Sequence, residues 1–363
     1  NLFKFKMIST NNPNSVVDKR ILEYKTLISP NNLKKNLPQT DKTRETILCG
    51  RKSIEDILDE KDSRIMVIIG PCSIHDIKTA EEYATKLKEL SNRISDKFLI
   101  VMRTYFEKPR TSIGWKGFIY DPNIDGSNNI NLGLSLSRKI LLHNARIGLP
   151  SATEYLESFT PQYNSDLISW TAIGARTVES PQHRQLASGL SMPVGFKNNT
   201  EGNIKAAINA LLSAREKHSF LGINELGIPC IINTSGNPYT HIVLRGSETN
   251  TNYDEKNVKN AQSQLKAHQL PPKIMIDCSH GNSKKDHGQQ IVVFKNIIQQ
   301  IKDGNKDIIG IMIESNLNSG KQTLPKYLKG FDSKNLLHGV SITDDCISWQ
   351  ETESLLFNVY RSL

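Results

Sequence analysis

The 363-residue chain contains no long hydrophobic run. None of its apolar stretches approaches the ~20 residues that a membrane-spanning helix needs. Its mean hydropathy of −0.42 is typical of an ordinary soluble protein. The N-terminal stretch NLFKFKMISTNNPNSVVDKR also lacks the apolar core, roughly 7–15 residues long, of a secretory signal peptide. We therefore expect no membrane segment and a cytoplasmic location.

Cysteine is scarce and widely spaced. The chain has five cysteines, an odd number, and none of them forms a CxxC pair: Cys49, Cys72, Cys230, Cys278 and Cys346. This pattern argues against a disulfide framework of the kind that stabilises small secreted proteins, and it favours a reducing compartment.

Aromatic residues are few, and positive charge is not gathered in runs. Aromatics make up 7% of the chain, and 46 Lys and Arg against 37 Asp and Glu give a formal charge of +9. A nucleic-acid-binding protein concentrates its cations on one face and interleaves them with aromatic platforms. Here the lysines are scattered among abundant Asn and Ile, a pattern that codon bias alone would produce. We therefore expect no nucleic-acid partner.

What the sequence does contain is a regular alternation of short strand-like runs with amphipathic helical segments such as TAEEYATKLKELSNRI. This alternation is typical of a parallel sheet, and eight such units predict a closed (β/α)8 TIM barrel. An open doubly wound sheet is the alternative, but no GxGxxG motif follows the first strand. The eight expected strands lie at 65–72, 98–105, 147–154, 168–176, 193–198, 240–246, 273–279 and 308–315.

Two segments fall outside this rhythm. Residues 1–60 form a polar N-terminal extension, for which we expect helices near 16–27 and 43–58. Residues 61–363 form the barrel domain, and within it 219–233 predicts an added β-hairpin between strands five and six.

Chemistry in a barrel gathers where the strands end, because all carboxyl ends meet at one face. Nearly every expected strand here ends on a charged or metal-ligating residue. One such residue is common, since strands must surface somewhere, but a succession of them indicates a site. These residues are Cys72, Arg103, Glu154, Arg176, Lys197, Arg245, Asp277 with His280, and Glu314, joined by Asp344 and Asp345 from a later loop.

The residues at the strand ends form two chemical sets. Six cations around one mouth would repel one another without an anionic ligand, so they predict a substrate or substrates with several phosphate or carboxylate groups. The cations are Arg103, Lys108, Arg110, Arg176, Lys197 and Arg245.

The second set is Cys72, His280, Glu314 and Asp344, which offer sulfur, nitrogen and oxygen donors. This mixture suits one divalent transition metal and leaves Mn²⁺, Fe²⁺, Co²⁺ and Zn²⁺ open. The alternative is structural: an incidental loop thiol and a packed histidine. Chemistry alone does not choose between Asp344 and its neighbour Asp345.

Longer motifs are specific enough to indicate a family. From about residue 45 to the C-terminus, the chain resembles type I 3-deoxy-D-arabino-heptulosonate 7-phosphate (DAHP) synthases of the microbial, feedback-regulated kind. The motifs that carry this resemblance are GPCSIHD, RTYFEKPRTSIGWKG, GLPSATE, WTAIGARTVESPQHRQLASGLSMPVGFKN, DCSHGNS and SITDDCISW.

The resemblance implies condensation of phosphoenolpyruvate with erythrose 4-phosphate and water, giving DAHP and phosphate, the first step of the shikimate pathway. It implies a metal held by Cys72, His280, Glu314 and Asp344. From the chemistry of this reaction we further hypothesise that Lys108, placed to contact both substrates, acts as a general acid and that Glu154 positions the water. The implied phosphoenolpyruvate site is Arg103, Lys108, Glu154, Ala175, Arg176, Lys197 and Arg245, and the implied erythrose 4-phosphate site is Lys108, Pro109, Arg110 and Thr111.

The same resemblance implies a homodimer or homotetramer inhibited by an aromatic amino acid. The implied effector residues are Pro161, Gln162, Ser191 and Phe220, near the N-terminal extension and the added hairpin. The chain departs from the family pattern where LRGS replaces the usual RGG, and its N-terminal arm has no clear match. The effector and the choice between dimer and tetramer therefore stay open.

Two alternatives share the expected barrel. A related synthase condenses phosphoenolpyruvate with arabinose 5-phosphate, but that family matches the KPRTSIGWKG segment poorly. A degenerate synthase kept as a regulator would have lost catalytic residues, whereas every position that we map here is filled.

Overall fold

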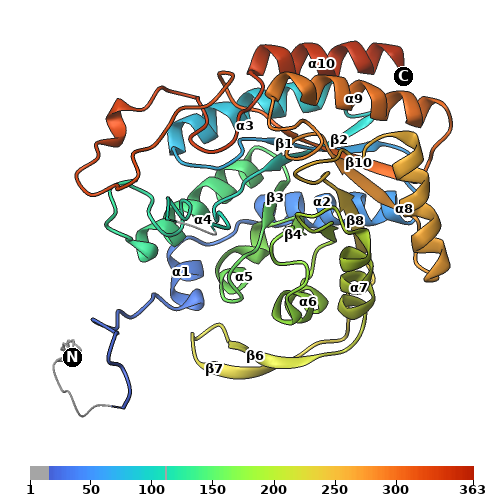
Figure 1. Ribbon diagram of the computed structural model, residues 1–363. Coiled ribbons are helices and arrows are strands. Elements are labelled where there is room, and N and C mark those ends of the chain that lie inside the picture. Colours follow the sequence, from blue (N-terminus) through green and yellow to red (C-terminus); the bar gives the residue numbers. More distant parts are fainter. Residues whose placement is uncertain (1–15, 111–112) are drawn as a thin grey trace.

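The computed structural model describes residues 16–110 and 113–363 (Figure 1). Eight parallel strands close into a barrel in the order β1-β10-β9-β8-β5-β4-β3-β2. This confirms the predicted (β/α)8 fold. The barrel strands are β1 (Ile65–Gly70), β2 (Phe98–Arg103), β3 (Ser151–Glu154), β4 (Trp170–Ile173), β5 (Val194–Lys197), β8 (Thr240–Leu244), β9 (Ile274–Asp277) and β10 (Ile308–Glu314).

Helices surround the barrel, as Figure 1 shows. In α3 (Ile77–Arg93) the side chains of Tyr83, Leu87 and Leu90 are buried, as expected for an amphipathic helix, and Asp76 caps its N-terminus by accepting from Thr79 N. The other outer helices are α4 (Ile130–Arg146), α5 (Thr160–Asn164), α6 (Pro181–Ser188), α7 (Ile204–Arg215), α8 (Glu255–Ala267), α9 (His287–Lys302) and α10 (Trp349–Ser362), with short 3₁₀ turns at Ser165–Leu167 and Ser333–Asn335. Among the described residues, no helix combines the length and apolar character needed to cross a membrane.

Helix α2 (Asp41–Leu58) closes the end of the barrel where the strands begin. Its fully buried Ile54, together with Ile57, joins the apolar cluster of the barrel interior, which includes Met66 and Ile68 of β1. Just beyond α2, Glu60 pairs with Lys273, which precedes β9, at 2.8 Å. Because this floor seals one end, the opposite end is left to carry the site.

The N-terminal extension differs in part from expectation. The helix predicted at 43–58 is confirmed within α2, and a short helix, α1 (Pro30–Asn36), precedes it. The helix predicted at 16–27 is wrong, since 19–29 has neither helix nor strand. Most apolar side chains of residues 16–27, Val16 and Leu22 among them, are exposed. A short segment that buries so little apolar surface gains too little to hold a helix in water.

The predicted hairpin is present. Strands β6 (Ser219–Ile223) and β7 (Pro229–Asn233) form a separate antiparallel sheet between α7 and β8, outside the barrel. Its turn contacts the extension, because Asn31 N donates to Glu225 O at 2.8 Å and Lys34 pairs with the Glu225 carboxylate at 3.1 Å. The extension and the hairpin therefore form one connected surface feature.

The floor formed by α2 predicts a stability difference between two aliphatic residues of this helix. Ile54→Ala opens a cavity under the barrel and should lower the free energy of unfolding by about 2–4 kcal/mol. The matched control Leu48→Ala, at a side chain that is 57% exposed, should change it by less than about 0.5 kcal/mol. Urea unfolding at fixed protein concentration measures both, and equal losses would contradict the assignment of α2 as the floor.

Candidate active site

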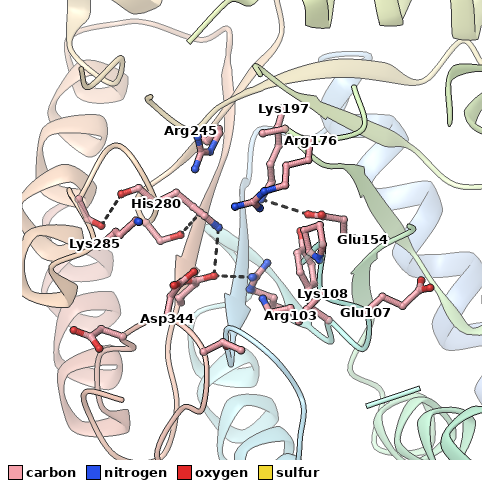
Figure 2. A pocket seen from close by; sticks show the side chains of 18 of the residues that line it. Arg103, Glu107, Lys108, Glu154, Arg176, Lys197, Arg245, His280, Lys285 and Asp344 are labelled. Carbon is pink, nitrogen blue, oxygen red and sulfur yellow. Dashed lines mark hydrogen bonds and ion pairs between the residues drawn. The ribbon is translucent and has the colours of Figure 1, made fainter. Parts of the chain in front are cut away.

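A cavity of about 230 Å³ opens at the carboxyl ends of the barrel strands. Figure 2 shows side chains from several strands and loops pointing into it. It brings together most of the residues that the sequence singled out, although they are far apart in the chain. Of those residues, the ones that line it are Arg103, Lys108, Pro109, Arg110, Glu154, Ala175, Arg176, Lys197, Arg245, His280, Glu314, Asp344 and Asp345.

Two further residues were predicted to bind metal or substrate, Cys72 and Thr111. Cys72 follows β1 and is fully buried, and its Sγ atom lies 3.2 Å from Lys108 Nζ. It therefore forms part of the wall beneath the cavity. Thr111 lies outside the described residues.

One side of the cavity is cationic. Lys197, at the end of β5, is buried and pairs with Asp277 at 3.2 Å and with Glu154 at 3.7 Å. Arg176 and Arg245 extend into the same space (Figure 2). Burial lowers the pKa of Arg245, and the nearby charge of Arg176 lowers it further, against the opposing effect of Asp277. This side of the cavity would gain stability from a bound anion.

Tyr105 explains how several cations come close together. The Arg103 guanidinium lies over its ring at 3.4 Å from the centroid. The Nζ atoms of Lys197 and Lys108 lie 5.6 and 6.0 Å from the same centroid. The electron-rich face of an aromatic ring attracts cations, so Tyr105 offsets part of their mutual repulsion.

The opposite side of the cavity holds the predicted metal donors. One ligand atom each from Cys72, Glu314 and Asp344 lie within 4.8 Å of one another. The fourth predicted donor, His280, has its Nε2 atom 3.8 Å from Glu314 Oε1. The second oxygen, Glu314 Oε2, is buried and has no hydrogen-bond partner in the described part of the chain. This mixed donor set and its unsatisfied oxygen fit a divalent transition metal.

The negative charges on the metal-donor side of the cavity are balanced by nearby cations. Arg103 donates to Glu314 at 2.6 Å, and both side chains are almost completely buried. Burial raises the pKa of the Cys72 thiol, as does the neighbouring Glu314 carboxylate, whereas Lys108 acts in the opposite direction. Burial also opposes ionisation of Asp344, but Lys108 and His280 outweigh it and lower the pKa of this carboxyl.

The geometry separates Asp344 from Asp345. Asp344 Oδ2 lies 3.8 Å from Cys72 Sγ, and Asp344 N lies 3.4 Å from the same sulfur. Asp345 instead faces His287 and Lys321, at 3.8 and 3.7 Å. Asp344 is therefore the better placed of the two to act with Cys72.

Glu107 and Asp277, for which the sequence indicated no role, are both buried, and Glu107 lines the cavity. Burial raises the pKa of Glu107 to about 8. Its carboxylate points away from the cavity centre (Figure 2) and accepts from Thr160 Oγ and from backbone N–H groups of the loop before α5. In the sequence, a carboxylate beside the basic run KPR is typical of an exposed loop, so only the fold shows that Glu107 is buried. Asp277 was visible as a strand end.

The predicted effector residues lie away from this cavity. Pro161 and Gln162 are on α5, Ser191 follows α6, and Phe220 is on β6. The end of the hairpin contacts α6 through Ser188 Oγ and Thr234 Oγ, 2.6 Å apart. These residues therefore lie on neighbouring outer elements.

Comparisons with known proteins agree with this architecture. The model of the DAHP synthetase I family matches residues 35–357. The "Phospho-2-dehydro-3-deoxyheptonate aldolase, Tyr-sensitive" of Escherichia coli (strain K12) is 47% identical over 343 residues, covering 94% of this chain and 95% of that protein. The "Phe-sensitive" protein of the same organism is 49% identical over 339 residues, covering 93% of this chain and 95% of that protein.

A solved structure shows the same fold. The phospho-2-dehydro-3-deoxyheptonate aldolase from Francisella tularensis SCHU S4 is 46% identical and aligns with a TM-score of 0.90, covering 94% of this chain and 98% of that one. Both the family match and the relatives extend over nearly the whole barrel, including its cavity. The chain belongs to the DAHP synthetase I family.

Proposed function

We propose that this protein condenses phosphoenolpyruvate with erythrose 4-phosphate and water to give DAHP and phosphate, the first step of aromatic amino acid biosynthesis. The observation that carries the proposal is one cavity with a cationic side facing a set of metal donors. Two phosphorylated substrates need the cations, and activation of an aldehyde needs an electrophile beside them. The names of the relatives support the same reaction.

The cationic side suits phosphoenolpyruvate. Arg176 and Arg245 offer planar guanidinium groups to its phosphate and carboxylate oxygens, and Lys197 adds a fixed point charge, held by Asp277 and Glu154. We assign Arg103, Lys108 and Ala175 to the same substrate, because they line the same cavity.

We infer that erythrose 4-phosphate binds to the segment that follows β2. Lys108, Pro109 and Arg110 line the cavity, and Arg110 Nε donates to Trp115 O at 3.2 Å. We assign these three residues and Thr111 to this substrate. Holding both anions in one cavity turns a bimolecular encounter into an intramolecular step, which is a large part of the rate gain.

We assign Cys72, His280, Glu314 and Asp344 as the residues that would hold one divalent metal ion, with Mn²⁺, Fe²⁺, Co²⁺ and Zn²⁺ all suited to the set. When bound there, the ion supplies a Lewis acid for the aldehyde oxygen. The protein contributes the fixed positions of these donors, because Cys72 and Glu314 are buried at the ends of neighbouring barrel strands.

Side chains assist the bond formation, the proton transfer and the addition of water. C3 of phosphoenolpyruvate attacks the aldehyde carbon, and Lys108, whose Nζ lies at the junction of the two sides, donates a proton to the new alkoxide. Water then adds to C2, and phosphate leaves as the C2 hydroxyl becomes the C2 ketone; of the two protons of this water, one restores Lys108 and the other leaves with the phosphate. Glu154, which lines the cavity next to Lys197, orients this water.

We further propose that residues 1–60 form an extension for assembly and regulation, besides the floor that α2 provides. Tyr163 OH of α5 donates to Ile28 O at 2.9 Å, and Asn31 contacts the hairpin turn. The extension thus contacts both α5, which carries Pro161 and Gln162, and the hairpin, which carries Phe220. With Ser191, these are our proposed effector residues.

Exposed apolar side chains on the hairpin, Leu221 and Ile231 among them, suit a homodimer or homotetramer. All five cysteines are unpaired, which suits a cytoplasmic location.

The first prediction concerns the metal. Protein purified without oxygen should release phosphate from the two substrates, lose this activity in EDTA and regain it with Mn²⁺. Cys72→Ser should lower turnover at least about tenfold, because the hydroxyl is a poorer ligand than a thiolate for this class of ion. The exposed Cys49 provides the control, since Cys49→Ser should retain activity. Activity that survives metal removal would contradict the proposed chemistry.

A second prediction concerns proton transfer. Lys108→Met should lower kcat by about 10²–10⁴-fold, the usual contribution of a general acid, and this loss should exceed the weakening of substrate binding measured by calorimetry, because Lys108 also contacts both substrates. The control is Lys116→Met, because Lys116 is exposed on the same loop. Unchanged turnover in Lys108→Met would remove the general-acid role.

A third prediction concerns regulation. One of phenylalanine, tyrosine and tryptophan should inhibit the wild-type enzyme. Phe220→Ala should raise its inhibition constant by roughly tenfold or more, since lost aromatic burial costs at least about 1.4 kcal/mol. Uninhibited turnover should be retained. Tyr327→Ala, at an exposed aromatic residue on a distant loop, should leave inhibition intact. Equal inhibition of Phe220→Ala and wild type would place the effector elsewhere.

A further inference from the structure

The carboxylate of Asp277 contacts both sides of the proposed active site. Asp277 is the last residue of β9 and is fully buried. Its Oδ2 atom lies 3.2 Å from Lys197 Nζ and 3.0 Å from His280 Nδ1. Its Oδ1 atom accepts from Ser279 N at 3.0 Å and from Ser279 Oγ at 2.7 Å. Both oxygens are therefore fully engaged with protein groups.

The burial of this carboxylate is compensated by its partners. Lys197 and His280 lie against one oxygen, and Ser279 donates to the other. Taking a carboxylate out of water is costly, and its partners repay that cost only where the geometry is good. The arrangement thus fixes the positions of the groups that surround Asp277.

The hydrogen bonds also define the state of the His280 ring. Ser279 Oγ uses its own proton on Asp277, so it accepts from His280 Nδ1, which lies 2.6 Å away. Nδ1 therefore carries the proton, facing both Asp277 and Ser279. In a neutral ring the lone pair is then on Nε2, the atom 3.8 Å from Glu314 Oε1.

The backbone holds this orientation as well. His280 has φ of +57°, a left-handed conformation that is uncommon for a residue with a side chain. Asn282 Nδ2 donates to Asp277 O at 2.9 Å and to Leu244 O at 3.2 Å. The turn after β9 is thereby fixed to both β9 and β8.

We propose that Asp277 is a positioning residue that presents Nε2 of His280 to the metal and, through the same carboxylate oxygen, holds Lys197 in the phosphoenolpyruvate site. This inference rests on the proposed function, and it adds a residue that contacts neither substrate nor metal. A carboxylate behind a ligating histidine orients the ring and increases its basicity, and its loss typically costs about 10–100-fold in metal affinity.

The test measures metal binding directly. Titration with Mn²⁺, with free Mn²⁺ followed by electron paramagnetic resonance, gives a dissociation constant for each metal-free protein without any turnover. Asp277→Asn should weaken Mn²⁺ binding by about 10–100-fold. It should also weaken phosphoenolpyruvate binding, because Lys197 loses the partner that fixes it.

Two matched controls separate positioning from general damage. Glu107→Gln replaces another buried carboxyl group at the cavity, one that hydrogen-bonds to the loop before α5 rather than to the donor set, and should bind Mn²⁺ like wild type. Lys197→Met should lose phosphoenolpyruvate affinity but keep Mn²⁺ affinity. A folded Asp277→Asn protein with a Mn²⁺ dissociation constant within twofold of wild type would overturn the proposal.

Asp277→Asn also leaves Lys197 with less compensation for its charge. If that variant unfolds, the double variant Asp277→Asn with Lys197→Met removes both charges, and it should bind Mn²⁺ more weakly than Lys197→Met alone. Equal binding by the two would overturn the proposal.

A further test records the NMR spectrum of the metal-free wild type and needs one variant, made only to assign the His280 resonances. At a pH where the ring is neutral, the ¹⁵N resonances of His280, assigned with His280→Gln, should show the proton on Nδ1 rather than on Nε2. The opposite tautomer would also overturn the proposal. Failure of the proposed function would give a different result, namely a wild-type protein that neither binds Mn²⁺ nor forms product.

Discussion

Closure of eight parallel strands brings every strand's carboxyl end to one rim, and this constraint organises the rest of the molecule. With the other end sealed by α2, charged residues on distant parts of the chain meet in a partly buried space. In such surroundings an unpaired charge is costly. Each cation at this rim therefore needs a carboxylate, an aromatic face or a bound anion nearby.

The structure meets this requirement unevenly. Arg103 has Glu314, Lys197 has Asp277 and Glu154, and Tyr105 lies beneath several of the cations. Arg176 and Arg245 extend into the cavity, and the pKa of Arg245 is lowered by burial and by Arg176. The paired cations Arg103 and Lys197 thus hold fixed positions in the cavity, whereas Arg176 and Arg245 leave more of their charge for a bound anion to compensate.

Sequence reasoning reached the barrel and much of the site because both follow from local patterns. Eight buried runs predict eight strands, and strand ends predict the rim. The same reasoning failed where the outcome depends on partners distant in sequence. Residues 16–27 have helical periodicity but no surface against which to bury it. Donor chemistry alone does not choose between Asp344 and Asp345. The family resemblance implies Asp344, and in the structure Asp344 Oδ2 lies 3.8 Å from Cys72 Sγ.

Glu107 shows most clearly why sequence could not supply the rest. It precedes Lys108, yet the two side chains serve different parts of the molecule: Lys108 contacts Cys72, whereas Glu107 accepts from the loop before α5. From α5, Tyr163 reaches the extension at Ile28. Consecutive residues of one loop therefore contact Cys72 on one side and, through α5, the N-terminal extension on the other. The backbone that places Lys108 is attached to the outer elements through the hydrogen bonds of the preceding residue.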